Sequence, residues 1–270
     1  MQLDLCLRSI AQNAPYFTDV KVLYLAEGKF KEGYKIVKEE HPNVTFLPED
    51  IDFPQQIWDI VSNNQQYFAW GTDDSLICTK VDLNADKLRW VFDVQNCVSI
   101  VMRVGENMKQ QDHFQNNPST PGPIIGRYED MIVWDVLQCN EQYDIGRPWQ
   151  NDCSIMPRDQ YLARLEYETY WREHKSKSLD YVGSSGRCFN PCKAAAFKDI
   201  VYLNNPVNLV HLSEDGKTLA DFGNWGRQIR YDTTTLNELF LMGKRINLDA
   251  LNLENVDCPR REMAYTFYRK

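Results

Sequence analysis

The order of helical and strand-like stretches in the first quarter of the chain constrains its fold more than any other feature. Apolar side chains recur at helical spacing over residues 3–10, and Asn13-Ala14-Pro15 ends that helix. Further helices are predicted over 31–40 and 53–62, with strands over 20–25, 44–47 and 67–70. Helices that alternate with strands in this way predict an α/β domain, with a Rossmann-like, mostly parallel sheet and covering helices.

The rest of the chain gives less regular patterns. Strands are predicted over 97–103, 131–137 and 200–203, helices over 159–175 and 236–243, and short helical elements over 88–92 and 194–196. Residues 108–126 are polar and too numerous for an ordinary connection, which indicates a long loop or a lid. The tail from residue 247 is predicted to be irregular. Because neither a repeat nor a linker divides the chain, residues 1–270 are interpreted as one domain.

Two adjacent carboxylates, Asp73 and Asp74, follow an apolar aromatic run that ends at Trp70. Gly71-Thr72 lets the backbone turn, so the pair is expected at the carboxyl end of a strand, where open α/β sheets bind ligands. Adjacent carboxylates repel each other, and a hard cation such as Mg²⁺ or Mn²⁺ with substrate phosphates relieves that repulsion. The competing interpretation is a turn or a helix cap.

Composition excludes several classes of function. The 270 residues carry a formal net charge of -8, which disfavours binding to nucleic acid or an acidic membrane. No apolar run is long enough to span a membrane and no signal peptide is seen, so a cytoplasmic location is expected. The eight cysteines form no CxxC pair and are predicted to be reduced and mostly buried. No phosphate-binding GxxxxGK[ST] loop exists, and residues 183–186 do not form a GxSxG nucleophile elbow.

Several stretches occur in an order that resembles the GT-A glycosyltransferases, in particular a bacterial and viral group close to the large inverting family. They are residues 3–10 with 20–25, 70–75 with the Thr-Asp-Asp motif, 102–107, 149–155, 205–211 and 236–246. The resemblance covers roughly residues 1–250. In that family an opening strand precedes the first helix, and here that strand is missing before Leu3.

The resemblance implies a metal-dependent enzyme that moves a sugar from a UDP-, GDP- or dTDP-sugar to a glycan or other hydroxyl acceptor, with inversion. Residues of about 1–110 would form the nucleotide-sugar half, and residues of about 127–250 the acceptor-side lobe. The expected cofactor is Mn²⁺ or Mg²⁺, which would stabilise the charge on the leaving diphosphate.

The resemblance also suggests residues for the donor site. Asp74 would be a direct metal ligand, and Asp73 would reach the ribose or a metal-bound water. His211 would complete the metal shell, although a lone histidine after an apolar run is more often structural. Arg103 would pair with the diphosphate or, alternatively, hold a buried carboxylate. Ser75 stands where the family often has a third acidic residue.

The acceptor side requires a base that takes the proton of the attacking hydroxyl. Asp152 is the candidate because it lies in the stretch that resembles the acceptor-side segment, and Glu141 and Asp144 are alternatives. A cap or turn role is the other interpretation of Asp152. Trp149 would stack on an acceptor sugar or pack in the core.

Two other functions are also compatible with these sequence features. A non-catalytic module that binds nucleotide sugars or glycans would keep the same fold, and Ser75 and the missing first strand favour it. A nucleotidyltransferase would also use acidic metal ligands on an α/β sheet. The donor base, the sugar, the acceptor and the oligomeric state are not encoded in these patterns.

Overall fold

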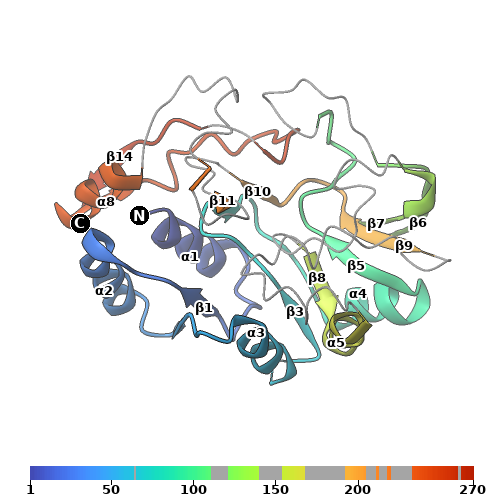
Figure 1. The fold of residues 1–270 in the computed structure, drawn as a ribbon. Coiled ribbons are helices and arrows are strands. Elements are labelled where there is room, and N and C mark those ends of the chain that lie inside the picture. The colour runs from blue at the N-terminus through green and yellow to red at the C-terminus, as the bar shows by residue number, and fades with distance from the viewer. Residues whose placement is uncertain are drawn as a thin grey trace.

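The computed structural model of this chain describes residues 1–63, 65–110, 121–139, 154–167, 192–204, 211–212, 218–219, 233–260 and 263–270. Figure 1 shows a mixed α/β fold in which helices lie beside the strands. The predicted α/β class is therefore confirmed.

The helices of the described residues agree closely with the predicted ones in the first half of the chain. They are α1 (Gln2–Asn13), η1 (Gly28–Phe30), α2 (Lys31–Glu40), α3 (Phe53–Ser62), α4 (Ala85–Arg89), the π-helix η2 (Trp90–Val94), η3 (Val136–Gln138), α5 (Arg158–Tyr167) and α8 (Thr233–Leu241). Asp52 caps α3, with its side chain accepting from the Gln55 amide, and Gly243 ends the last helix segment with a positive φ of 80°.

The strands form one large sheet and several short pairs. They are β1 (Lys21–Tyr24), β2 (Thr45–Pro48), β3 (Tyr67–Ala69), β4 (Ser75–Ile77), β5 (Cys97–Val101), β6 (Ile124–Tyr128), β7 (Met131–Asp135), β8 (Ser154–Pro157), β9 (Lys193–Phe197), β10 (Tyr202–Asn204), β11 (His211–Leu212), β12 (Thr218–Leu219), β13 (Lys244–Ile246) and β14 (Phe267–Arg269). The six-stranded sheet has the order β3-β8-β5-β9-β7-β6. Parallel β1 and β2 pair separately, as do the antiparallel pairs β4–β10, β11–β12 and β13–β14.

The direction of the strands makes the large sheet mixed. Strand β5 is parallel to β9, whereas β8 is antiparallel to both β3 and β5, and β7 is antiparallel to both β9 and β6. Strands β3, β5, β9 and β6 therefore share one direction and β8 and β7 run against them, so that only the β5–β9 pair is parallel and the other neighbouring pairs of this sheet are antiparallel.

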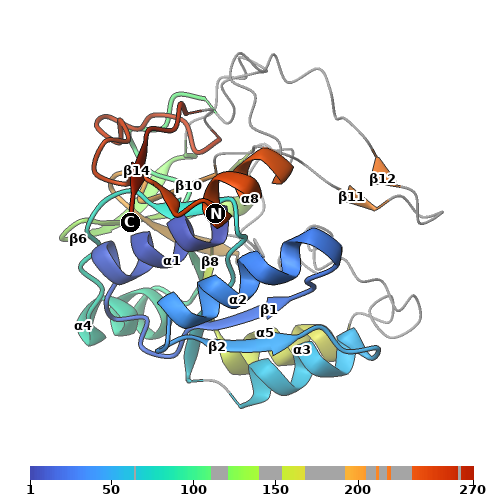
Figure 2. The same ribbon diagram turned by 90° about the vertical axis from the view of Figure 1, so that its left-hand side faces the viewer.

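Strand β1 separates two helical layers because alternate residues of a strand face opposite sides. On one side, Val22 packs against a cluster formed by α1, α2 and α8, which contains Leu7, Val37 and Phe240. On the other side, Leu23 packs against the cluster of α3 and α5. Figure 2 shows this order, with α1 and α2 on one side of β1 and β2 and with α3 and α5 on the other.

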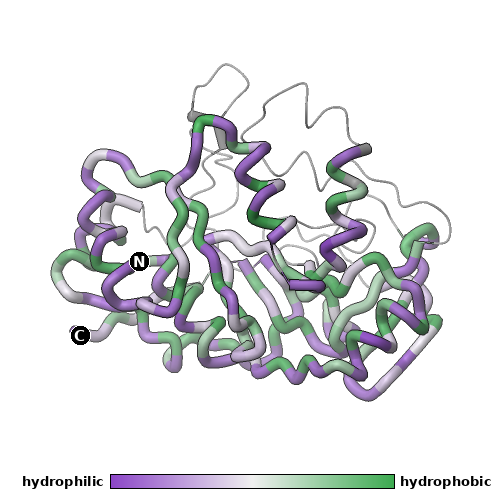
Figure 3. The backbone as a smooth tube through the Cα atoms, turned by 90° about the horizontal axis from the view of Figure 1, so that it is seen from below, coloured by the Kyte–Doolittle hydropathy of each residue, from purple (hydrophilic) through white to green (hydrophobic). Residues whose placement is uncertain are grey.

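Hydropathy along the backbone follows this layered arrangement. In Figure 3 the helices alternate between hydrophobic and hydrophilic colours along their length, as expected when one face of each covers a sheet. In α3 the inward face consists of Phe53, Ile57 and Val61, all of which are buried. Full burial of such a side chain contributes about 1.5–3 kcal/mol to folding.

Residues 194–196, predicted as a short helix, form the middle of strand β9, so that prediction is wrong. Ala194, Ala195 and Ala196 are fully buried between β5 and β7. Alanine favours a helix in isolation, but here two neighbouring strands supply the backbone hydrogen bonds of an extended segment.

Two further strands were predicted as loop. Residues 124–126, expected at the end of a loop or lid, belong to β6, which alternates half-buried and exposed side chains and pairs with β7. Residues 111–120 of that predicted loop lie outside the described residues. The tail, expected to be irregular, contains β14, which pairs with β13. Strand β6 forms a hairpin with β7, which follows it directly in the chain, whereas β14 pairs with the more distant β13.

Most described cysteines agree with the expectation of reduced thiols. Cys6, Cys78, Cys97 and Cys258 are free and buried, and Cys139 is free and partly buried. Burial raises the pKa of Cys78 to about 12, which makes its thiol inert. Cys192, in contrast, is disulfide-bonded, with its partner outside the described residues, so the prediction of reduced cysteines is wrong at this position.

Candidate functional site

Asp73 and Asp74 lie in the turn between β3 and β4, as the sequence predicted. The turn is closed by a hydrogen bond of 3.2 Å from the Ser75 amide to the Thr72 carbonyl. Residues 67–69 form the strand that leads into it, and Phe68 is buried. The pair therefore follows the carboxyl end of an edge strand of the large sheet.

Helix α1 holds this turn from one side through polar side chains. Ser9 Oγ accepts from the Ile77 amide at 3.0 Å, and Asn13 Nδ2 donates to the Ile77 carbonyl at 2.7 Å. The Cys6 thiol lies 3.7 Å from the Thr72 carbonyl oxygen. Since Ser9 and Asn13 are buried, these bonds fix β4 against the helix.

One carboxylate oxygen of Asp74 is held by its neighbours. Its Oδ1 accepts from Thr72 Oγ1 at 2.7 Å and from Asn204 Nδ2 at 3.2 Å. Its Oδ2 makes no hydrogen bond to the described residues. The residue is half-buried. This geometry fixes the orientation of the carboxylate and leaves the second oxygen for a ligand.

Asn204 is a site residue that the sequence analysis missed. It ends strand β10 and lies opposite Ser75 of β4 in the antiparallel register. Its Nδ2 also donates to Ser75 Oγ at 2.7 Å, while its Oδ1 accepts from Arg103 at 2.6 Å. The residue is buried. The one local signal is a polar residue directly after the apolar stretch 200–203.

Arg103 lies behind Asn204, directly beyond the strand β5. It is only 1 % exposed, and its guanidinium donates to Asn204 Oδ1. Arg103 is therefore connected to Asp74 through the amide of Asn204. Its partner here is the buried amide of Asn204, whereas the alternative interpretation of the sequence had it hold a buried carboxylate. Direct contact with a diphosphate stays a prediction.

The surroundings of Asp73 disfavour its charge. The residue is exposed at the surface, but protein atoms around its carboxyl displace part of its hydration and raise the pKa. The neighbouring charge of Asp74 raises that pKa further, and the N-terminal ammonium of Met1 and the backbone amides of the turn partly oppose the shift. A cation beside Asp73 would reverse both unfavourable effects.

The donor set at this turn fits a hard divalent cation that also binds substrate oxygens. Neither Asp73 nor Asp74 forms an ion pair with a lysine or arginine of the described residues. In the same part of the chain, no group of three histidine, cysteine or acidic side chains gathers as a ready-made metal site. Mg²⁺ is commonly held by one or two carboxylates plus phosphates and water, which is what two aspartates can offer.

Tyr34, which the sequence analysis missed, lies near enough to Asp73 to be affected by its charge. Burial raises the pKa of Tyr34 to about 12, and the charge of Asp73 adds to this effect. The ring of Tyr34, on α2, stacks on that of Tyr24 at the end of β1, with 5.0 Å between centroids. Lys38 Nζ lies 4.1 Å from the centre of the Tyr24 ring. The ring of Tyr24 is thus covered by Tyr34 and Lys38, and Tyr34 is the member of the pair that the charge of Asp73 reaches.

The structure does not describe the side chains of the remaining predicted site residues. Asp152, Glu141, Asp144 and Trp149 lie outside the described residues. The backbone of His211 starts β11 and pairs with Leu219, but the structure does not describe its side chain. Their roles stay predictions.

Comparisons with known proteins found no relative of this chain. The sequence matches none of the protein-family models against which it was compared, and it matches no curated protein. Among the described residues, none of the helices combines the length and the apolar character needed to cross a bilayer.

Proposed function

We propose that this chain is a metal-dependent glycosyltransferase of the GT-A type, which transfers a sugar from a nucleoside diphosphate to a hydroxyl acceptor with inversion. The observation that carries the proposal is the fixed orientation of Asp74, whose Oδ1 is held by Thr72 and Asn204 while Oδ2 stays available. A carboxylate held in this way beside a second one suits a cation that bridges two phosphates.

Each residue of the donor side would have a separate role. Asp74 would hold Mn²⁺ or Mg²⁺, and Asp73 would hold a metal-bound water or the ribose. When bound, the cation would supply Lewis-acid stabilisation of the departing diphosphate. Arg103 would act through Asn204 by keeping the Asp74 carboxylate in place.

The transfer itself would be a displacement at the anomeric carbon. The acceptor hydroxyl oxygen attacks that carbon, the bond from the carbon to the diphosphate oxygen breaks, and the hydroxyl proton passes to a carboxylate. Asp152 is the candidate for this base, with His211 as a candidate further metal ligand.

One observation favours a second function, that of a non-catalytic nucleotide-sugar or glycan-binding module. Ser75 is buried, and its hydroxyl contacts Thr72 and Asn204. A third acidic ligand is therefore not available at this position, which limits the charge that the turn can offer a metal.

Hydrolysis of a panel of nucleotide sugars in the presence of Mn²⁺ tests the enzyme. We expect turnover that chelator abolishes and that Asp74→Asn lowers by about a hundredfold or more. Asp199→Asn is the matched control, because Asp199 is an exposed aspartate in a turn after a strand, remote in sequence from the pair. Nucleotide-sugar binding without turnover would favour the module, and pyrophosphate release from a nucleoside triphosphate would favour a nucleotidyltransferase.

A further inference from the structure

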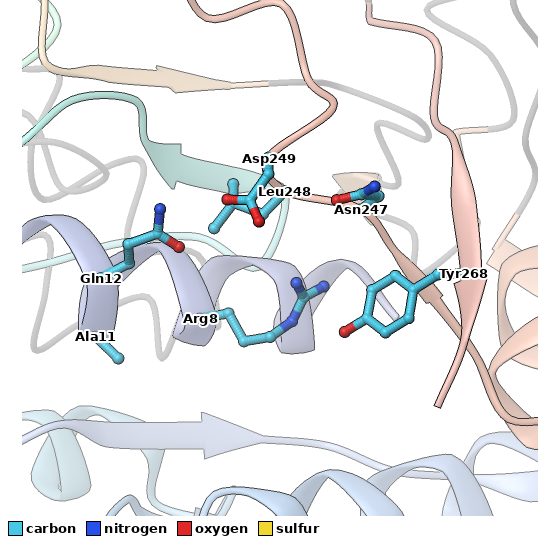
Figure 4. A pocket seen from close by; sticks show the side chains of 7 residues that line it. All are labelled: Arg8, Ala11, Gln12, Asn247, Leu248, Asp249 and Tyr268. Carbon is cyan, nitrogen blue, oxygen red and sulfur yellow. The ribbon is translucent and has the colours of Figure 1, made fainter.

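A pocket lies between helix α1 and the C-terminal part of the chain. Its volume is about 590 Å³, and its polar lining comes from Arg8, Gln12, Asn247, Asp249 and Tyr268. Figure 4 shows these side chains arranged around one space, with Arg8 and Gln12 on the helix and the others across from them. Neither aspartate of the candidate site contributes to it. A volume of this size is typical of small-molecule sites.

The polar groups of this pocket have unused hydrogen-bonding capacity. Within the described part of the chain, the side chains of Gln12, Asn247 and Asp249 make no hydrogen bond. Two amides and one carboxylate thus present both donors and acceptors to the same space. Groups of this kind are the usual partners of neighbouring hydroxyls on a polyhydroxylated ligand.

Two hydrogen bonds to neighbouring residues fix the side chain of Arg8. Its Nε donates to Asp4 Oδ2 at 3.1 Å and its Nη2 donates to the Ile246 carbonyl at 2.7 Å. Asp4 is buried and is also bonded to His41 at 3.1 Å. Arg8 therefore presents fixed donors to the pocket, while its charge is balanced by Asp4.

The charge of the pocket disfavours an anionic ligand. Arg8 is already paired with Asp4, and Asp249 adds a further negative charge to the lining. A phosphate or an acidic sugar would meet this carboxylate without a free cation to offset it. A neutral ligand meets no such penalty.

Tyr268 supplies an aromatic face. It is 41 % exposed and lies on β14, and its ring packs against no other aromatic ring among the described residues. Pyranose rings have an apolar face of C–H groups that suits such a platform, and Leu248 adds a buried apolar contact at the same pocket.

We propose that this pocket binds a neutral saccharide, with Tyr268 as the stacking platform and Asp249, Asn247, Gln12 and Arg8 as hydroxyl partners. The site shares no residue with the aspartate pair, so the proposal does not depend on the proposed transfer reaction. In a glycosyltransferase it would retain a glycan away from the donor site, and in a binding module it would be a recognition site in its own right.

Saturation-transfer NMR and calorimetry with neutral mono-, di- and trisaccharides of glucose, galactose, mannose and N-acetylglucosamine test this proposal. We expect at least one to bind, Tyr268→Ala to weaken the affinity about tenfold, and Asp249→Asn to weaken it about fivefold. Tyr268→Phe keeps the ring and should stay within about threefold of the wild type.

Two controls separate this site from the aspartate pair and from loss of folding. Arg269→Ala changes an exposed neighbour on the same strand and should leave saccharide affinity unchanged. Asp74→Asn should also leave it unchanged. The proposal is overturned if no neutral saccharide binds at about 10 mM, if Tyr268→Ala and Asp249→Asn bind as the wild type does, or if Asp74→Asn alone removes binding.

Discussion

Asn204 Nδ2 lies 3.2 Å from Asp74 Oδ1, and this hydrogen bond joins the end of β10 to the turn that carries the aspartate pair. The two residues are 130 positions apart in the sequence. Because Arg103 donates to the other end of the same amide, the orientation of the asparagine is set as well. The position of a carboxylate at the surface is thus determined by buried groups beneath it.

Replacement of Asn204 by alanine should weaken metal binding. Asp74 would lose a donor that orients its carboxylate, and loss of such a supporting partner typically lowers metal affinity about 10–100-fold. Mn²⁺ titration followed by calorimetry measures this directly, and nucleotide-sugar hydrolysis at increasing Mn²⁺ should show the same shift.

Asn107→Ala is the matched control for that experiment. Asn107 also makes two structural hydrogen bonds, accepting from the Ile200 amide at 2.9 Å and donating to the Val256 carbonyl at 2.7 Å, but none to the aspartate turn. It should lower the melting temperature without a change in Mn²⁺ affinity. Equal Mn²⁺ affinities for Asn204→Ala and the wild type would contradict a positioning role for Asn204.

The raised pKa of Asp73 should make metal binding depend on pH. The folded metal-free protein holds this proton more tightly than the unfolded chain does, so ionisation of Asp73 destabilises the fold as pH rises through the folded pKa. A cation cancels that penalty. We therefore expect Mn²⁺ to raise the melting temperature more at pH 7.5 than near the pKa of the carboxyl, measured by thermal shift.

Asp73→Asn tests the source of this pH dependence. It removes the titrating group, so the metal-free variant should lose the fall in stability that accompanies Asp73 ionisation. If the variant and the wild type show the same pH profile without metal, Asp73 is not the group responsible.

The first half of the fold could be predicted from the sequence because its signals are local. Helices α2 and α3 have the predicted limits, because apolar residues at helical spacing define the face that each helix buries and His41-Pro42 follows the end of α2. The aspartate turn could be found for the same reason, as an abrupt change from aromatic to acidic residues within a few positions.

The parts that sequence analysis missed depend on distant partners. Strand β9 forms from three alanines because β5 and β7 enclose them. Asn204 belongs to the site only because β10 pairs with β4, and Tyr34 only because α2 places it near Asp73. No local pattern around these residues reports such neighbours, so their roles emerge from the three-dimensional arrangement alone.

The ion pair between Glu40 and Arg245 should contribute stability that disappears in acid. The guanidinium of Arg245 donates from Nη2 to Glu40 Oε1 at 2.6 Å and from Nε to Glu40 Oε2 at 3.0 Å. These hydrogen bonds lower the pKa of Glu40. A lowered pKa stabilises the fold above the carboxyl's ordinary value, and this is lost as pH falls through the folded pKa. We expect Glu40→Gln to cost about 1.5–3 kcal/mol at pH 7.

Urea denaturation at pH 7 and at low pH measures this contribution. The difference between Glu40→Gln and the wild type should shrink as the pH falls. Glu32→Gln is the control, because its pair with Lys35 is longer, at 3.5 Å, and exposed on both sides. It should change the free energy of unfolding by less than about 0.5 kcal/mol. A pH-independent cost of Glu40→Gln would show that packing, and not charge, accounts for it.

Gly105 should be intolerant of even a single methyl group. A Cβ at this position would lie 2.6 Å from the Ile200 amide nitrogen and 2.7 Å from the Asp199 carbonyl carbon, both of which are main-chain atoms. Since the backbone must move, Gly105→Ala should cost about 1–3 kcal/mol in urea denaturation. Gly126→Ala is the matched comparison, because its nearest neighbour is the flexible end of Gln95 at 3.3 Å, and a cost below about 0.5 kcal/mol is expected. Similar costs for the two variants would mean that the close approach at Gly105 does not determine the packing of residues 103–107 against 199–200.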